Sequence, residues 1–160
     1  MHKKSPFEKK VRVRVCGILS EPQGILLIKH EGIGEGGHLW SPPGGGVEFG
    51  ERLEQCLERE FKEETNIDVK ATAYLFSNEH IDRIHHAIEL FFKVVRVSGE
   101  LQLGSDPELA QEDQMMKEAR FFTPEALYQL PENTLHEAFL TSNSRERIGD
   151  LRGLITFKDK

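Results

Sequence analysis

A short segment of this chain combines a run of glycines with a cluster of acids. The glycines are Gly44, Gly45 and Gly46, and the acids Glu60, Glu63 and Glu64 follow in a helical pattern. These acids stand at i, i+3 and i+4, so they share one helical face, where like charges repel. A divalent cation would relieve the repulsion, because magnesium prefers carboxylate, carbonyl and phosphate oxygens. The segment therefore predicts a metal-dependent phosphate site.

The residue types within this segment suggest separate roles. Glycines lack a β carbon and let a ligand approach the backbone closely. Arg59 and Glu63 are one helical turn apart, so the guanidinium could orient that carboxylate, which leaves Glu60 and Glu64 to hold metal. Glu51 could hydrogen-bond within the glycine loop or join the acids. The alternative interpretation is an ordinary solvated helix face beside an ordinary turn.

The elements that position these residues follow from hydrophobic periodicity. Alternation over residues 11–15, turn chemistry at 21–24 and an apolar run at 25–28 predict a β-hairpin. Apolar residues at three- and four-residue steps predict a helix from Arg52 to Thr65. Asn66 then ends it, because asparagine tolerates the left-handed conformation.

The rest of the chain is predicted to hold three more strands and two more helices. The strands cover residues 69–76, 87–97 and 119–122. One helix starts at Thr123-Pro124 and ends at Pro131, and a last helix covers residues 134–140. Residues 98–117 are expected to form a loop with at most a helical turn. This order predicts an α+β sandwich with a mixed sheet, rather than a regular βαβ winding.

Composition limits the class of protein. The 160 residues fit one domain, 1–160, with flexible ends expected at about 1–8 and 158–160. A net charge of −6 argues against binding to nucleic acid polymers or anionic membranes, but not against a small phosphorylated substrate. Cys16 and Cys56 are expected to pack in the core. Met1 precedes no apolar segment long enough for a signal peptide, so a cytoplasmic location is expected.

The glycine and acid pattern resembles the signature of the Nudix hydrolases, the MutT-like family, G-x5-E-x7-R-E-U-x-E-E-x-G-U, where U is a bulky apolar residue. Gly45 takes the first glycine position, Glu51 the isolated glutamate, and residues 59–67 the remainder. Asn66 replaces the usual second glycine and Phe61 the usual aliphatic residue. Neither departure removes a charged position.

The resemblance implies the Nudix α/β/α sandwich, with a central mixed sheet and the Nudix loop-helix. It implies hydrolysis of a nucleoside diphosphate linked to another moiety X, with Mg²⁺ or Mn²⁺ as cofactor. The implied metal ligands are Gly44, through its carbonyl, and the acids Glu60, Glu63 and Glu64. The implied catalytic residues are Glu51, Arg59, Glu63 and Glu64. A homodimer is possible, as in other members.

Substrate recognition is less determined by the sequence. Family members often recruit a further downstream acid, for which Glu112, Asp113 and Glu118 are candidates, with Glu118 favoured. His85, His86 and Arg14 are candidate substrate contacts, each with a plain surface role as the alternative. Sequence markers of ADP-ribose and dinucleoside-polyphosphate hydrolases are not found at residues 81–86. A non-catalytic Nudix-like nucleotide sensor is the competing function.

Overall fold

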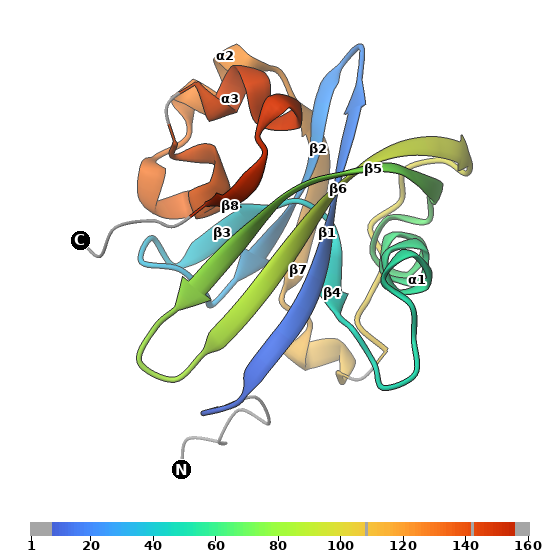
Figure 1. The fold of residues 1–160 in the computed structure, drawn as a ribbon, viewed down its shortest axis with the longest axis vertical. Helices are drawn as coiled ribbons and strands as arrows, with labels where there is room; N and C mark the ends of the chain where they lie inside the picture. Colours follow the sequence, from blue (N-terminus) through green and yellow to red (C-terminus); the bar gives the residue numbers. More distant parts are fainter. Residues whose placement is uncertain (1–7, 108, 142, 156–160) are drawn as a thin grey trace.

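The computed structural model describes residues 8–107, 109–141 and 143–155, and is built on a mixed eight-stranded sheet (Figure 1). The strands are β1 (Val11–Glu21), β2 (Gly24–Glu31), β3 (His38–Ser41), β4 (Gly44–Gly46), β5 (Asp68–Ile81), β6 (His86–Ser98), β7 (Met116–Phe122) and β8 (Gly153–Ile155). Their order is β3-β2-β1-β6-β5-β8, with β4 beside β1 and β7 beside β2. Parallel pairs β1–β6 and β5–β8 occur among antiparallel ones, which confirms the predicted mixed sheet. Of the flexible ends predicted at about 1–8 and 158–160, residues 1–7 and 158–160 lie outside the described residues.

Strand β1 joins the two halves of the sheet. It pairs with β2 only at the hairpin tip, Ser20 with Ile25 and Glu21 with Gly24. From Leu19 back to Val11 it instead runs parallel to β6. The predicted hairpin is therefore confirmed only at its tip. Beyond the tip the two strands diverge into two layers, with a core on each side of β1.

Alternation along β1 sends its side chains to two different cores. Val15 and Leu19 pack with Phe61 of helix α1 (Leu53–Thr65) and are fully or almost fully buried. Cys16 and Ile18 face the other way and pack with residues of β2, β5 and β6. The buried placement of Cys16 and Cys56 confirms the expected core role. One strand thus positions helix α1 and, on its opposite face, the interior between the layers.

Helix α1 lies on one side of the long strands, and the short C-terminal helices lie on the other (Figure 1). Its bounds match the prediction, with Arg52 as the N-cap residue. Asn66 adopts the left-handed conformation at φ 61°, and its N–H donates to the Lys62 carbonyl. The expectation that asparagine could replace glycine at this position is confirmed. No helix in the described residues is long and apolar enough to cross a membrane.

The glycine run forms a strand, so its interpretation from the sequence as a loop was wrong. Gly44, Gly45 and Gly46 form β4 and pair with Cys16, Val15 and Arg14 of β1. Glycine is required by close approach, because a β carbon on Gly44 would lie 2.0 Å from the Val15 carbonyl oxygen. One on Gly45 would lie 2.3 Å from the Glu60 carboxylate. The run therefore brings the backbone of β4 against the acidic helix.

The C-terminal region is more irregular than the sequence predicted. Helix α2 (Pro124–Gln129) is capped by Thr123 as expected. The predicted helix over 134–140 is wrong: 3₁₀ turns η2 (Glu132–Thr134) and η3 (Glu137–Phe139) flank a bridge between Leu135 and Trp40. Helix α3 (Ser144–Arg147), turn η4 (Ile148–Asp150) and β8 were not predicted. These elements are held in place by long-range packing, in which Phe139 and Ile148 contact core residues of the sheet.

The loop before β7 and the histidine-rich segment also differ from expectation in detail. Residues 99–110 are irregular as predicted, and the turn η1 (Gln111–Asp113) is the only regular element between β6 and β7 in the described residues. The strands predicted at 69–76 and 87–97 extend to Ile81 and start at His86, so the histidine-rich segment forms a tight hairpin. The two strands are longer than predicted because β5 and β6 pair from Asp68 and Ser98 as far as Ile81 and His86.

We predict that Gly44→Ala destabilises the fold by about 1–3 kcal/mol, because the new methyl group would collide with the β1 backbone. Gly149→Ala is the control, since a β carbon there meets nothing within 4 Å. Urea unfolding followed by circular dichroism measures both free energies. Equal stability of the two variants would contradict the close approach of β4 to β1.

Candidate active site

Arg59 is the centre of a network that joins the loop before α1 to the helix itself. Its Nε lies 2.7 Å from Glu51 Oε1 and its Nη2 3.0 Å from Glu51 Oε2, a two-point ion pair. The hydrogen bonds from Arg59 lower the pKa of Glu51 to about 2. Glu51 also accepts the Glu48 amide at 3.1 Å. Glu51 therefore makes both kinds of contact that the sequence left open: a hydrogen bond within the loop and, through Arg59, a link to the acids of the helix.

The same guanidinium reaches the acids of the helix. Arg59 Nη1 lies 2.9 Å from Glu60 Oε1 and 3.3 Å from Glu63 Oε2. The predicted Arg59–Glu63 contact is thus present, but it is longer than the contacts with Glu51 and Glu60. Arg59 holds three carboxylates at once, and its positive charge offsets their mutual repulsion.

Glu60 and Glu64 lie against the glycine strand. The Glu60 carboxylate occupies the space where a β carbon of Gly45 would stand. Glu64 is 8% exposed, and its Oε2 accepts the Gly44 amide at 3.0 Å. Burial and the charge of Glu60 raise the pKa of Glu64 to about 8, although the Gly44 hydrogen bond opposes the shift. Two acids are therefore confined together at a site where both cannot ionise without compensation.

These residues fit a hard divalent cation by their donor atoms. Carboxylate oxygens such as those of Glu60 and Glu64, together with backbone carbonyl oxygens, are the ligands that magnesium and manganese prefer. Within the described ranges, no three His, Cys, Asp or Glu side chains are already gathered in a metal-binding geometry. Arg59 forms ion pairs with Glu60 and Glu63 in this arrangement. The role of the Gly44 carbonyl stays a prediction, as do the separate ligand assignments.

Two arginines of β1 point toward this site from the sheet. Arg14 pairs in register with Gly46 on one side and Glu89 on the other, and its charge acts on both Glu60 and Glu64. Its Nη1 lies 3.7 Å from Glu89 Oε1. Arg12 lies against Gly46, where a β carbon would come within 2.6 Å of Nη2. Arg14 thus acts on these acids through its charge, and its role as a substrate contact stays a prediction.

A buried polar network next to Arg14 was missed by sequence reasoning. Glu89 Oε2 accepts the Asn78 amide at 2.9 Å and the His136 ring at 2.9 Å. His136 Nδ1 accepts the Ala138 amide, so its ring proton is on Nε2 and is donated to Glu89. Burial raises the pKa of Glu89, but these contacts outweigh it and hold the pKa below its ordinary value. A lone Glu within a predicted strand gives no sequence signal of this kind.

Residues 9–142 match the family model of the NUDIX domain. The chain belongs to the Nudix family. A curated relative, ADP-ribose pyrophosphatase of Methanocaldococcus jannaschii, is 37% identical over 112 residues. That match covers 69% of this chain and 60% of the relative, so the chain spans less than two thirds of the relative's length.

Solved Nudix structures share the fold. A MutT Nudix hydrolase from Burkholderia pseudomallei is 25% identical, with a TM-score of 0.65 over 88% of this chain and 99% of its own. A Nudix hydrolase from Nitrosomonas europaea reaches a TM-score of 0.71 at 16% identity, over 89% of this chain and 93% of its own. The predicted α+β sandwich is confirmed by these likenesses.

The candidate downstream acids lie on strand β7 and in the turn that precedes it. Glu118 lies on β7, opposite Lys29, and its carboxylate is 3.6 Å from Arg120. Glu112 and Asp113 lie in the exposed turn η1. No hydrogen bond or ion pair in the described part of the chain joins them to the Nudix acids. Which acid assists stays a prediction.

Asp106 is a nearer acid that sequence reasoning missed. Its negative charge contributes to the raised pKa of Glu64. Its loop is tied to the helix end, since the Gly104 amide donates to the Glu64 carbonyl at 2.8 Å. Gln114 clamps the loop by accepting the Asp106 amide and donating to the Asp106 carbonyl. A cavity of about 310 Å³ is lined by residues of this loop.

The candidate substrate histidines lie at the β5–β6 hairpin of the Nudix fold. His85 Nδ1 is 3.0 Å from Asp82, and His86 Nε2 is 2.9 Å from Glu79. Both contacts lie within the hairpin, so a structural role is enough to explain the two histidines. Their substrate role stays a prediction. His80 is better connected, because its Nδ1 is 3.1 Å from Glu137, which also accepts the Asn78 amide.

We predict that Glu137→Gln lowers the pKa of His80, which the hydrogen bond to Glu137 raises to about 9, toward 6.5. The folded-state pKa is raised, so the pair contributes stability below pH 6.5 that is lost as pH rises through 9. NMR titration of the histidine side-chain signals measures the pKa. Glu132→Gln is the control, because Glu132 is 70% exposed and pairs with Arg145. An unchanged His80 pKa in Glu137→Gln would contradict the contact.

Proposed function

We propose that this protein is a metal-dependent pyrophosphohydrolase that cleaves a nucleoside diphosphate linked to another moiety X. The observation that carries the proposal is the confinement of Glu60 and Glu64 against β4, with Arg59 supplying the compensating charge. A site of this kind is costly for the folded protein unless a cation uses it. Membership of the Nudix family indicates the class of reaction, hydrolysis of a diphosphate linkage, and the geometry of this site suits that reaction.

The chain's own residues would prepare the site for a cation. The two-point pair with Glu51 fixes the Arg59 guanidinium, whatever the helix acids do. Glu60 and Glu63 can then exchange their contacts with Arg59 for a metal ion without losing their orientation. Glu64 accepts the Gly44 amide through Oε2, and its second oxygen can serve as a ligand. Magnesium or manganese, when bound, neutralises the diphosphate and promotes hydroxide formation.

Arg14 is suited to the substrate side of the same site. Its backbone is held by strand pairing on both sides, opposite Gly46 and opposite Glu89. The position of the guanidinium is therefore restricted. A guanidinium fork matches phosphate oxygens well. We therefore assign Arg14 to a phosphate of the substrate, and Glu89 to holding the arginine there. His85 and His86 remain weaker candidates because each has a local acidic partner.

ADP-ribose is the first substrate to test. The support is the 37% identity to the protein named ADP-ribose pyrophosphatase. The sequence marker of that specificity is not found at residues 81–86, so nucleotide sugars, dinucleotides and nucleoside triphosphates belong in the same screen. We further propose that the protein is cytoplasmic and acts on such small molecules as a homodimer, and its net charge of −6 disfavours nucleic acid polymers as partners.

We predict that Glu64→Gln lowers the rate of hydrolysis on the best substrate by on the order of 10²–10⁴-fold, because metal stabilisation of the transition state is worth several kcal/mol. Glu54→Gln is the matched control, since it removes the same charge from an exposed position in the first turn of the same helix. Phosphate-release assays with magnesium or manganese measure both rates. Near-wild-type turnover in Glu64→Gln would contradict the catalytic assignment.

Added metal should also raise the melting temperature of the wild-type protein, because a ligand that binds only the folded state stabilises it. The shift should be much smaller in Glu64→Gln. A metal-induced shift without hydrolysis of any substrate in the screen would favour the nucleotide-sensor alternative. No shift and no hydrolysis would leave only a structural acidic helix.

A further inference from the structure

The interior of the protein holds a carboxylate that lies outside the glycine and acid motif. Glu89 stands in the middle of β6, and its side chain is 5% exposed. A buried carboxylate is costly unless hydrogen bonds and opposite charges compensate it. Two donors meet its Oε2, the Asn78 amide at 2.9 Å and the His136 ring at 2.9 Å. The fold therefore gathers two buried donors around one oxygen of Glu89.

These donors leave the other oxygen of Glu89 to Arg14. Glu89 Oε1 lies 3.7 Å from Arg14 Nη1, and the Arg14 side chain is 34% exposed. Charge-assisted hydrogen bonds of arginine are ordinarily about 2.7–2.9 Å, so Glu89 attracts the guanidinium without taking up its donors. The charge of Arg14 also acts on Glu60 and Glu64. Arg14 is thus held from one side by a buried anion and has N–H groups available for a ligand.

The ring of His136 is fixed through both of its nitrogens. Nδ1 accepts the Ala138 amide at 3.1 Å, which caps the turn η3, so the ring is neutral and its proton is on Nε2. Nε2 donates that proton to Glu89. A neutral donor leaves the negative charge of Glu89 to Arg14, whereas an imidazolium would compete with Arg14 for it. The two contacts of the ring therefore have different consequences, one for the turn and one for Glu89.

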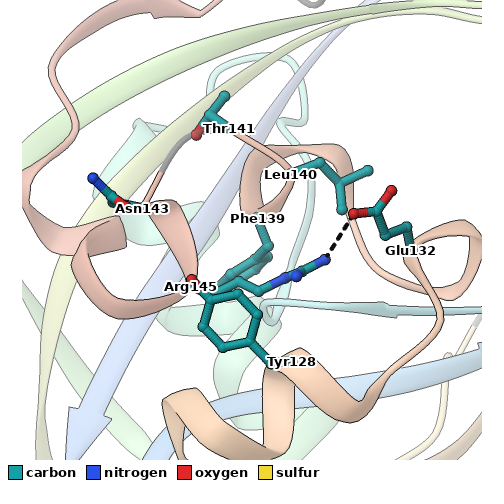
Figure 2. A pocket seen from close by; sticks show the side chains of 7 residues that line it. All are labelled: Tyr128, Glu132, Phe139, Leu140, Thr141, Asn143 and Arg145. Carbon is teal, nitrogen blue, oxygen red and sulfur yellow. Dashed lines mark ion pairs between the residues drawn. The ribbon is translucent and has the colours of Figure 1, made fainter.

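The turn that carries His136 is held by packing and by the neighbouring strand. The His136 amide donates to the Trp40 carbonyl at 2.9 Å, which ties the turn to β3. Phe139 is almost fully buried in the core between the layers. Toward the outer side, Phe139 and Arg145 line one small pocket, and Arg145 pairs with Glu132 (Figure 2). The C-terminal layer therefore gives His136 a fixed position relative to the sheet.

We propose that His136 is a positioning residue for the substrate: its Nε2 proton fixes Glu89, and Glu89 in turn aims the Arg14 guanidinium at a substrate phosphate. Asn78 supports the same Glu89 oxygen from β5. The inference rests on the proposed function, because it takes Arg14 as a phosphate contact. It adds that this contact is set from the C-terminal layer, by a residue 47 positions from Glu89 in the sequence.

Two substitutions separate the two contacts of the His136 ring. Asparagine places an oxygen near the position of Nδ1, so His136→Asn keeps an acceptor for the Ala138 amide and removes the donor to Glu89. Glutamine reaches further, so His136→Gln keeps a donor for Glu89 and loses the cap. A purely structural role predicts that His136→Gln is the more harmful change for ligand binding. The positioning role predicts that His136→Asn is.

The probe is methylenediphosphonate, a diphosphate mimic whose P–C–P link is not hydrolysed. Isothermal titration calorimetry of the full chain with excess magnesium measures its affinity. We expect His136→Asn to weaken binding about fivefold or more and His136→Gln to stay within about twofold of the wild type, the scale of one hydrogen bond. Glu137→Gln is the matched control and should bind as the wild type does. It changes the next residue of the same turn, which contacts Asn78 and His80 instead of Glu89.

Arg14→Gln shows whether the effect of His136 passes through the arginine. This substitution should weaken probe binding about tenfold or more, because it removes a charged fork that matches phosphate oxygens. In the His136→Asn background it should add much less, because residues that act through one contact do not have additive effects. Glu89→Gln should weaken binding as His136→Asn does, and it tests the same link if His136→Asn does not fold.

The proposal is overturned if His136→Asn or Glu89→Gln binds the probe as tightly as the wild type. It is also overturned if His136→Gln weakens binding as much as His136→Asn, or if the effects of His136→Asn and Arg14→Gln are additive. Wild-type affinity in Arg14→Gln would overturn the phosphate role of Arg14 and this inference together. The proposed hydrolysis fails by a different result, the absence of turnover with every substrate in the screen, which leaves the binding results unchanged.

Discussion

The contact between the glycine strand β4 and the acids of helix α1 is the constraint on which the rest of the structure depends. Gly44 lies against the β1 backbone, and Gly45 lies against the Glu60 carboxylate. Any β carbon there would separate the sheet from the helix. The short strand therefore sets both the position of α1 over the sheet and the burial of Glu64. Fold and site share this one interface.

Strand β1 carries that constraint into the rest of the molecule. It pairs with β4, β6 and the tip of β2, and its alternate residues serve two cores. Val15 packs under the acidic helix, whereas Arg14, one residue earlier, points to the opposite face of the strand and pairs with Glu89. A strand that is buried along its centre has a fixed register, since a one-residue slip would exchange these faces. The placement of Arg14 is thus a consequence of core packing.

The C-terminal layer shows how polar groups can be buried far along the chain from the main motif. His136 enters the interior to donate to Glu89, and Asn78 joins Glu89 to Glu137. On the outer side of the same layer, Arg145 lies over Tyr128 beside a small cavity. Both arrangements use short turns whose side chains reach several elements. The layer therefore both covers the sheet and places polar side chains from several short turns next to one another.

The sequence by itself determined the family, the bounds of helix α1 and the partnership of Arg59 with the acids, because helical spacing and the glycine requirement are local properties. It could not predict that the glycines form a strand, since pairing with β1 is a long-range contact. Nor could it find Asp106, Asn78 or His136, whose neighbours are distant in the chain. Only the tertiary structure decided these, because burial and charge proximity depend on which elements pack together.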